Sequence, residues 1–143
     1  MADRTAHVTW SGSLMEGAGT ITSVESGSFG PLDVTWAARA EADSAGLTSP
    51  EELIAAAHAA CFSMALSHGL AQAGTPPEKL ETSATVTFVP GTGITKVALV
   101  VRATAPGLEE PAFLHAANAA KENCPVSKAL AAVPEITLDA TLV

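Results

Sequence analysis

The sequence predicts an α+β protein in which helices cover one face of an antiparallel sheet. Three observations favour this class: strand-like alternation in the N-terminal third, one long apolar helix after it, and further strands interleaved with short helices in the C-terminal half. A chain of 143 residues has the length of one domain, so we expect a single domain over residues 1–143.

The N-terminal third alternates apolar and polar residues in the manner of half-buried strands. The segments are AHVTW at 6–10, GTITSVES at 19–26 and LDVTWAARA at 32–40, and clusters of Gly and Ser separate them. This pattern predicts a meander of three antiparallel strands.

A long helix is predicted to follow the segment GLTSP. Ser49 suits the N-cap, Pro50 suits the first helical position, and Glu52 stands three residues after the cap and completes a capping box. Apolar residues occupy most sides of the helix from Leu53 onward, so we expect it to be buried on most sides. Polar interruptions and the acidic start favour a core helix over a membrane span. Gly74 marks its end.

The C-terminal half predicts a hairpin, two short helices and a last strand. LETSATVTFV at 80–89 and ITKVALVVRATA at 94–105 form the hairpin around the turn PGTG. The pattern is helical from Pro111 to Glu122, and Pro125 starts a second short helix. EITLDATLV at 135–143 then completes the sheet.

Composition and charge restrict the possible partners. Hydrophobic residues make up 48% of the chain and charged residues 15%, which is more apolar surface than we expect a monomer to hide. A net charge of −8 with only seven Lys and Arg argues against nucleic acid and anionic membranes. The first ten residues lack a secretory pattern, so we expect a cytoplasmic protein whose cysteines do not form a permanent disulfide.

Cys61 lies in the middle of the long helix, twelve positions after Ser49, where the helix dipole no longer acts. Lowering a thiol pKa from about 8.5 to about 6 requires roughly 3.4 kcal/mol of differential stabilisation. One Arg at about 4 Å supplies roughly 4 kcal/mol at an effective dielectric near 20, while desolvation acts in the opposite direction. One guanidinium is therefore about enough to activate this thiol.

Cys124 immediately precedes Pro125 and would occupy the N-cap of the short helix. Free N–H groups and the positive end of the dipole favour a thiolate there, so local physics makes Cys124 the more activated thiol. Its place between two short elements also suits a resolving cysteine. Sequence spacing leaves open whether the two Cα atoms lie within the roughly 4.4 to 6.8 Å that a disulfide requires.

Other interpretations of these residues stay open at this point. Cysteine is often buried and inert, so both thiols can be structural. Cys61, Cys124, His58 and His115 could together bind zinc, although no metal-binding spacing supports it. His58, one turn before Cys61, could form a Cys–His dyad with hydrolase chemistry, but a neutral core histidine is favoured.

Five segments are distinctive together: ESG at 25–27, SPEELIAAAHAACFSMAL, ITKVAL, NCPVSKAL and EITLDATL. They resemble the OsmC branch of the OsmC/Ohr family, which is named for osmotic induction and organic hydroperoxide resistance, and the resemblance covers nearly the whole chain. It implies an OsmC-like fold, with an antiparallel sheet wrapped around a long buried central helix in an intertwined homodimer. It also implies a thiol peroxidase that uses no metal, haem or other cofactor.

The resemblance further implies a role for four residues. Cys61 would be the peroxidatic cysteine and Cys124 the resolving one, which replaces the ranking from local physics. Arg39 and Glu51 match the family's Arg and Glu, although the segment between them is about two residues longer and TWAARA departs from the usual context. Because Glu51 precedes Cys61 by ~15 Å along one helix, we expect it to orient Arg39, and the pair to reach the partner subunit's sulfur.

The predicted reaction reduces organic hydroperoxides to alcohols. Cys61 becomes a sulfenic acid, Cys124 condenses with it, and a dithiol reduces the disulfide, with lipoyl-type dithiols as candidate donors. Such an enzyme would act in the oxidative and hyperosmotic stress responses. The alternative is a non-catalytic redox sensor or a stress-response binding protein that uses the same cysteine pair.

Overall fold

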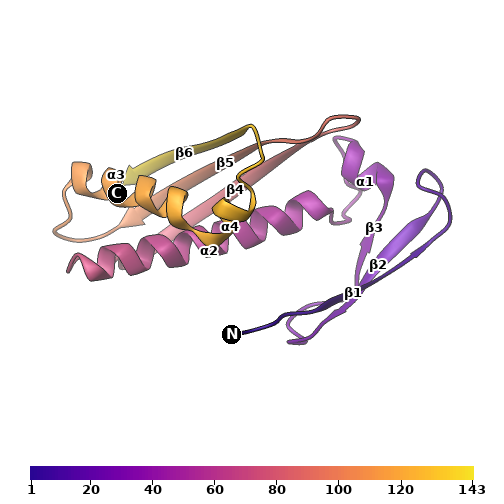
Figure 1. Ribbon diagram of the computed structural model, residues 1–143, viewed down its shortest axis with the longest axis horizontal. Coiled ribbons are helices and arrows are strands. Elements are labelled where there is room, and N and C mark those ends of the chain that lie inside the picture. The colour runs from indigo at the N-terminus through magenta and orange to yellow at the C-terminus, as the bar shows by residue number, and fades with distance from the viewer. The chain divides into compact units, whose positions relative to one another are not determined.

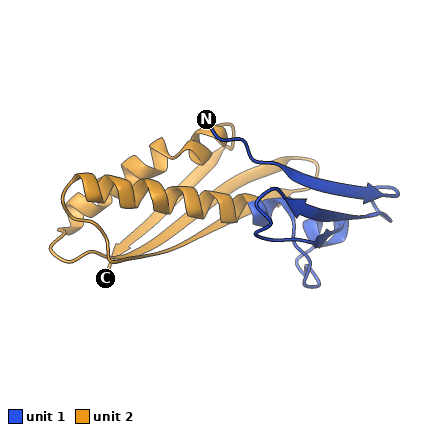
Figure 2. Ribbon diagram, turned by 90° about the horizontal axis from the view of Figure 1, so that it is seen from below, with its two compact units in different colours: residues 1–53 blue, residues 54–143 orange.

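The computed structural model describes all 143 residues, which form two compact units, Met1–Leu53 and Ile54–Val143 (Figure 2). Figure 1 labels the elements, whose bounds are β1 (Ala6–Ser11), β2 (Ala18–Val24), β3 (Leu32–Val34), α1 (Trp36–Ala40), α2 (Pro50–Gln72), β4 (Lys79–Val89), β5 (Gly93–Thr104), α3 (Glu110–Asn123), α4 (Pro125–Ala129) and β6 (Glu135–Leu142). That the two units form one domain stays a prediction.

The first unit contains the predicted antiparallel meander, in the order β1-β2-β3. Gly19 lies at its centre, paired with Trp10 on one side and Val34 on the other. A Cβ at Gly19 would lie 2.6 Å from a ring carbon of Trp10. The meander therefore needs glycine at this position because the indole packs directly over the backbone.

The prediction of one strand over 32–40 is wrong in its second half. The strand ends at Val34, and Trp36–Ala40 forms α1. Thr35 is the N-cap, and its Oγ1 accepts a hydrogen bond from the N–H of Ala38 at 3.1 Å. Alanine and arginine are strong helix formers, so a capping threonine ahead of WAARA starts a helix where alternation had indicated a strand.

The start of α2 confirms the predicted cap and corrects one half of the capping box. Ser49 Oγ accepts from the N–H of Glu52 at 3.2 Å, as an N-cap should. The carboxylate of Glu52, however, accepts a hydrogen bond from Thr48 Oγ1 at 2.6 Å. Glu52 therefore accepts from Thr48, whereas a complete capping box would have it accept from the N–H of Ser49.

The second unit has the order β4-β5-β6, and the predicted β4–β5 hairpin is confirmed. The expectation of an all-antiparallel sheet is wrong, because β6 pairs with β5 in parallel, with Val97 opposite Ile136 and Leu99 opposite Leu138. A parallel pair requires a long crossover, and α3 and α4 supply it between the two strands.

The core of the second unit lies between β5 and two helices. Its buried side chains come from α2, β5 and α3, and they are Phe62, Leu66, Leu70, Leu99, Val101, Ala103, Phe113, Ala117 and Ala120. The three residues from β5 alternate along the strand and share one face. Both helices therefore cover the same face of this sheet, as predicted, and Figure 1 shows this arrangement.

The helix α2 is less buried in the single chain than its apolar composition predicts. Only 22% of its most apolar 18-residue stretch is buried, and the side chain of Met64 is 71% exposed. Length and mean hydropathy alone would let α2 cross a membrane, but a core helix in a protein outside membranes meets the same criterion. Phe62, Leu66 and Leu70 of this helix are buried in the core of the second unit, whereas Met64 is not.

Candidate functional site

The two cysteines, 63 positions apart in the chain, lie side by side in the second unit. Cys124 Sγ is 2.8 Å from Cys61 Sγ and both thiols are free. Cys61 is presented by the middle of α2, and Cys124 stands between α3 and α4 as the C-cap of the first and the N-cap of the second. The structure thus brings together two residues whose proximity sequence spacing left open.

The two thiols differ in their access to solvent. Cys124 is 0% exposed, whereas Cys61 is partly exposed. Of the two residues, Cys61 is therefore the more accessible to solvent. The pair thus joins a partly exposed cysteine to a fully buried one.

The two thiols also differ in proton affinity. Burial raises the pKa of the Cys61 thiol, and the hydrogen bond with Cys124 raises it further, although the N–H of Val126 partly offsets both. Burial works against ionisation of Cys124 too, but hydrogen bonds from Cys61 and from the N–H groups of Ser127 and Val126 lower its pKa below the ordinary value. These opposite directions of the two pKa shifts make Cys124 the more acidic thiol of the pair, which is the ranking that local physics gave from the sequence.

A second polar pair lies beside the cysteines. His58 Nε2 is 2.7 Å from Ser127 Oγ, and these side chains are 0% and 6% exposed. Burial lowers the pKa of His58, so the ring is neutral near pH 7. This is the core histidine that the sequence favoured, since Nε2 binds Ser127 and Nδ1 has no hydrogen-bond partner, which leaves no Cys–His dyad.

The remaining predicted residues meet in the first unit. Arg39, in the last turn of α1, donates from Nη2 to Glu51 Oε1 at 2.8 Å and from Nε to the two carboxylate oxygens at 3.1 and 3.3 Å. The Glu51 side chain is 7% exposed and that of Arg39 is 33% exposed. The ion pair is bidentate and largely shielded, a geometry that fixes the orientation of the guanidinium plane.

The four predicted site residues therefore form two pairs, one in each unit. The cysteine pair belongs to Ile54–Val143, and the Arg39–Glu51 pair belongs to Met1–Leu53. Sequence reasoning missed Ser127, whose hydroxyl joins His58 to the segment that carries Cys124. The available signal was its position three residues after the N-cap, where side chains and N–H groups turn back toward the cap.

The zinc alternative finds no support in the side-chain arrangement. The chain has no group of three or more His, Cys, Asp or Glu side chains placed to hold a metal ion. His115 lies on α3 and lines a hollow between α2 and α3 that neither cysteine lines. Cys61, Cys124, His58 and His115 are therefore not gathered into such a group within this chain.

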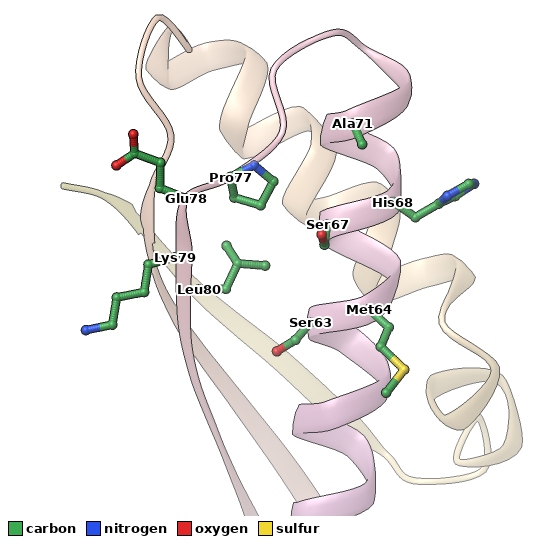
Figure 3. A pocket seen from close by; sticks show the side chains of 9 residues that line it. All are labelled: Ser63, Met64, Ser67, His68, Ala71, Pro77, Glu78, Lys79 and Leu80. Carbon is green, nitrogen blue, oxygen red and sulfur yellow. The ribbon is translucent and has the colours of Figure 1, made fainter.

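Two surface hollows flank α2 in the second unit. One, of about 630 Å³, lies between α2 and α3, and its mainly apolar lining includes Leu70 and Leu108. The other lies between α2 and the start of β4, where Figure 3 shows Ser63 and Ser67 on the helix and Leu80 across from them. Neither cysteine lines either hollow.

The chain is similar in sequence to one protein family and to named proteins within it. The profile of the family described as OsmC-like protein matches residues 42–139. Proteins named Peroxiredoxin OsmC from Escherichia coli K12 and from Shigella flexneri are each 44% identical to this chain over 133 residues, covering 91% of it and 90% of the relative.

Solved structures agree with the sequence matches. The organic hydroperoxide resistance protein OhrB of Bacillus subtilis covers 97% of this chain and 98% of its own, with a TM-score of 0.60 and 26% identity. An organic hydroperoxide resistance protein OsmC from Legionella pneumophila, at 24% identity, TM-score 0.66 and 96% coverage of both chains, shows the same fold. By its profile match and its 44% identity to named members, this chain belongs to the OsmC-like protein family.

Proposed function

We propose that the protein is a cysteine-based thiol peroxidase that reduces organic hydroperoxides to alcohols. One observation carries the proposal most strongly: the partly exposed Cys61 has its sulfur 2.8 Å from that of the fully buried Cys124. A two-cysteine peroxidase needs one thiol that reacts with the peroxide and a second thiol close enough to form a disulfide with the oxidised sulfur. The names of the relatives, peroxiredoxin and organic hydroperoxide resistance protein, support the same chemistry.

Cys61 is the attacking sulfur in this proposal, although Cys124 has the lower pKa within the pair. We assign the attack to Cys61 because the peroxide must approach the attacking sulfur in line with its O–O bond, and Cys124 is 0% exposed. The Cys61 thiolate attacks one oxygen of ROOH, an S–O bond forms as the O–O bond breaks, and ROH leaves after taking up a proton. Cys61 is then a sulfenic acid.

Arg39 supplies the positive charge that this step needs. Because burial and Cys124 both raise the pKa of Cys61, the thiolate needs a cation from outside the cysteine pair. Glu51 holds the guanidinium of Arg39 by a bidentate contact and leaves it partly exposed, so the group is oriented and still accessible. We propose that this pair stabilises the Cys61 thiolate and the charge that develops as the O–O bond breaks.

Whether Arg39 acts on its own chain or on a partner is part of the proposal. We propose the partner subunit, and mixed dimers test it. Dimers that combine a Cys61→Ser chain with an Arg39→Ala chain should recover one working site if the pair acts across subunits. Recovery no greater than that of either parent dimer would place the pair in cis.

The second half of the cycle returns both thiols. Cys124 attacks the sulfenic sulfur, the S–O bond breaks, and water leaves as the disulfide forms. A dithiol, with lipoyl-type donors proposed, then reduces the disulfide by exchange. The redox groups are the two sulfurs themselves, so the proposal includes no metal or other cofactor.

A homodimer is proposed to cover α2. The apolar side of this helix that the single chain leaves open, with Met64 71% exposed, is the kind of surface that oligomers bury. A cytoplasmic location, where thiols are kept reduced, is part of the same proposal. The net charge of −8 supports the absence of nucleic acid and anionic membranes among the partners.

The function is tested by steady-state consumption of cumene hydroperoxide with dihydrolipoamide as the donor. The wild-type protein and a Ser83→Ala control on the exposed side of β4 should turn over, and Cys61→Ser should be inactive. If the disulfide forms once but no dithiol supports turnover, the protein is the redox sensor of the alternative. If Cys61→Ser turns over normally, the proposed mechanism is wrong.

A further inference from the structure

Side chains join α2 to the segment that carries Cys124 at two points. Cys61 Sγ lies 2.8 Å from Cys124 Sγ, and His58 Nε2 lies 2.7 Å from Ser127 Oγ. His58 precedes Cys61 by three residues, and Ser127 follows Cys124 by three residues. The histidine–serine contact therefore lies about one helical turn from the sulfur contact in both segments.

Cys124 is held in its own segment through the backbone. Its N–H donates to the carbonyl of Ala120 in α3 at 2.9 Å, and its carbonyl accepts from the N–H of Lys128 in α4 at 3.1 Å. Its side chain forms no capping hydrogen bond with α4. The place of the Cys124 sulfur opposite Cys61 therefore depends on where α3 and α4 lie relative to α2.

The two helices beside Cys124 are attached to α2 in different ways. The helix α3 contributes Phe113, Ala117 and Ala120 to the core that it shares with α2. The helix α4 has five residues, of which only Ser127 forms a side-chain hydrogen bond with another element.

This single hydrogen bond is well shielded from water. His58 is 0% exposed and Ser127 is 6% exposed. Nδ1 of the ring has no hydrogen-bond partner, so the polar contact of His58 is with α4 alone. Breaking a buried hydrogen bond leaves its groups unsatisfied, so the bond opposes any movement of α4 away from α2.

We propose that the hydrogen bond between His58 and Ser127 keeps the two sulfurs adjacent while both thiols are free. His58 and Ser127 are then positioning residues for disulfide formation, and neither touches the peroxide. This positioning role rests on the proposed function and names what places the resolving cysteine.

The positioned step forms one bond and breaks another. The Cys124 thiol gives its proton to solvent and its sulfur attacks the sulfur of the Cys61 sulfenic acid. An S–S bond forms as the S–O bond breaks, and the oxygen takes up a proton and leaves as water. Two groups that are already held side by side react faster and more completely, because their freedom of movement is lost before the reaction.

Loss of the hydrogen bond should affect the reduced protein and the oxidised protein differently. Without it, α4 is free to move away from α2 in the reduced protein, whereas the disulfide still holds it in the oxidised protein. Disulfide formation must then order α4 as well as join the sulfurs. Removal of the hydrogen bond should therefore lower the effective concentration of one thiol at the other.

The bland alternative is a bond that stabilises the reduced and oxidised proteins equally. Its loss would lower the free energy of unfolding and leave the disulfide equilibrium unchanged. Ser63 offers a matched control, because its hydroxyl lies 2.8 Å from both the carbonyl of Ala59 and Thr82 Oγ1. Ser63→Ala thus removes a serine hydrogen bond that joins the same helix to β4 instead of α4.

The test measures the equilibrium of the Cys61–Cys124 disulfide in buffers of dihydrolipoic acid and lipoic acid, with no peroxide present. Mass spectrometry after alkylation of free thiols gives the oxidised fraction. We expect Ser127→Ala and His58→Leu to lower the equilibrium constant for disulfide formation about three- to tenfold, the size of one intramolecular hydrogen bond. His58→Gln keeps a donor and should recover part of the loss, and Ser63→Ala should match the wild type.

Two results would overturn the proposal. One is an equilibrium constant in Ser127→Ala and His58→Leu equal to that of the wild type. The other is an equal fall in Ser63→Ala, which would show a general loosening of α2. Because no peroxide is used, a shift confined to Ser127→Ala and His58→Leu supports the positioning role even in a protein that proves inactive on cumene hydroperoxide.

A single-turnover experiment checks the rate of the same step. After one equivalent of cumene hydroperoxide and rapid quenching, the Cys61 sulfenic acid should last about three- to tenfold longer in Ser127→Ala than in Ser63→Ala. Equal lifetimes would count against the proposal. Circular dichroism checks folding, and if Ser127→Ala does not fold, His58→Leu against His58→Gln gives the same comparison.

Discussion

The ion pair between Arg39 and Glu51 is expected to stabilise the first unit as well as to serve the reaction. Arg39→Met removes the guanidinium but keeps much of its length, and it leaves the Glu51 carboxylate, 7% exposed, without its main donors. Glu51→Gln keeps the shape of the acceptor and removes its charge. The two single variants and the double variant form a cycle that isolates the pair.

The expected size of the effect follows from the contacts. Arg39 Nη2 donates to Glu51 at 2.8 Å, and Arg39 Nε is shared between the two carboxylate oxygens at 3.1 and 3.3 Å. These contacts amount to two charged hydrogen bonds, each worth about 1.5 to 3 kcal/mol. Desolvation of Glu51 opposes this gain, and the 33% exposure of Arg39 lets water screen it. We expect a loss of about 2 to 3 kcal/mol for Arg39→Met and a coupling of about 1 to 2 kcal/mol.

Urea unfolding of the four proteins, monitored by circular dichroism at one fixed protein concentration, measures the cycle. The coupling should lie well above the scatter of about 0.5 kcal/mol that independent sites show. Losses that simply add within that scatter would mean that the ion pair contributes nothing to stability. The reasoning that the pair orients the guanidinium would then lose its basis.

Three further predictions concern stability. Phe62→Ala should lower the free energy of unfolding by about 3 to 5 kcal/mol, because Phe62 is 0% exposed in the core of the second unit, and a loss below about 1 kcal/mol in urea unfolding would contradict that packing. Thr35→Ala should lower the free energy of unfolding by about 1 kcal/mol through the lost N-cap of α1, and Thr35→Ser should lower it less. Equal urea midpoints for the wild type and both variants would refute the cap. Burial lowers the pKa of His58 in the folded state, so the unfolded chain takes up this proton first; the contribution of His58 to stability is therefore present above about pH 6.5 and lost as pH falls below it. Urea unfolding of wild type and His58→Gln at several pH values should show a weaker decline in the variant, and parallel declines would contradict the assignment.

Local signals in the sequence predicted the local structure well. The start of α2 was readable because Ser49, Pro50 and Glu52 act within one turn of each other, and the β4–β5 hairpin because its turn lies between two alternating segments. The segment 32–40 misled because its alternation continued past Thr35, whose side chain ends the strand by capping α1. Threonine suits both a strand and a helix N-cap, so the residue type alone does not tell which of the two Thr35 adopts.

Contacts between distant segments were not readable in the same way. The parallel pairing of β6 with β5 depends on how α3 and α4 return the chain, and no residue in β6 specifies the direction of its partner. The contact between His58 and Ser127 joins positions 69 apart, and it exists only because α4 packs beside α2. The proximity of Cys61 to Cys124 has the same origin, so resemblance to a family could suggest it while spacing could not.

The most direct test of the account is mass spectrometry after one equivalent of organic hydroperoxide, with wild-type protein and with Cys124→Ser. The account predicts a bond between Cys61 and Cys124 in the first protein and a trappable sulfenic acid on Cys61 in the second. Oxidation that appears first on Cys124, or a Cys61 that stays reduced in both proteins, would contradict it.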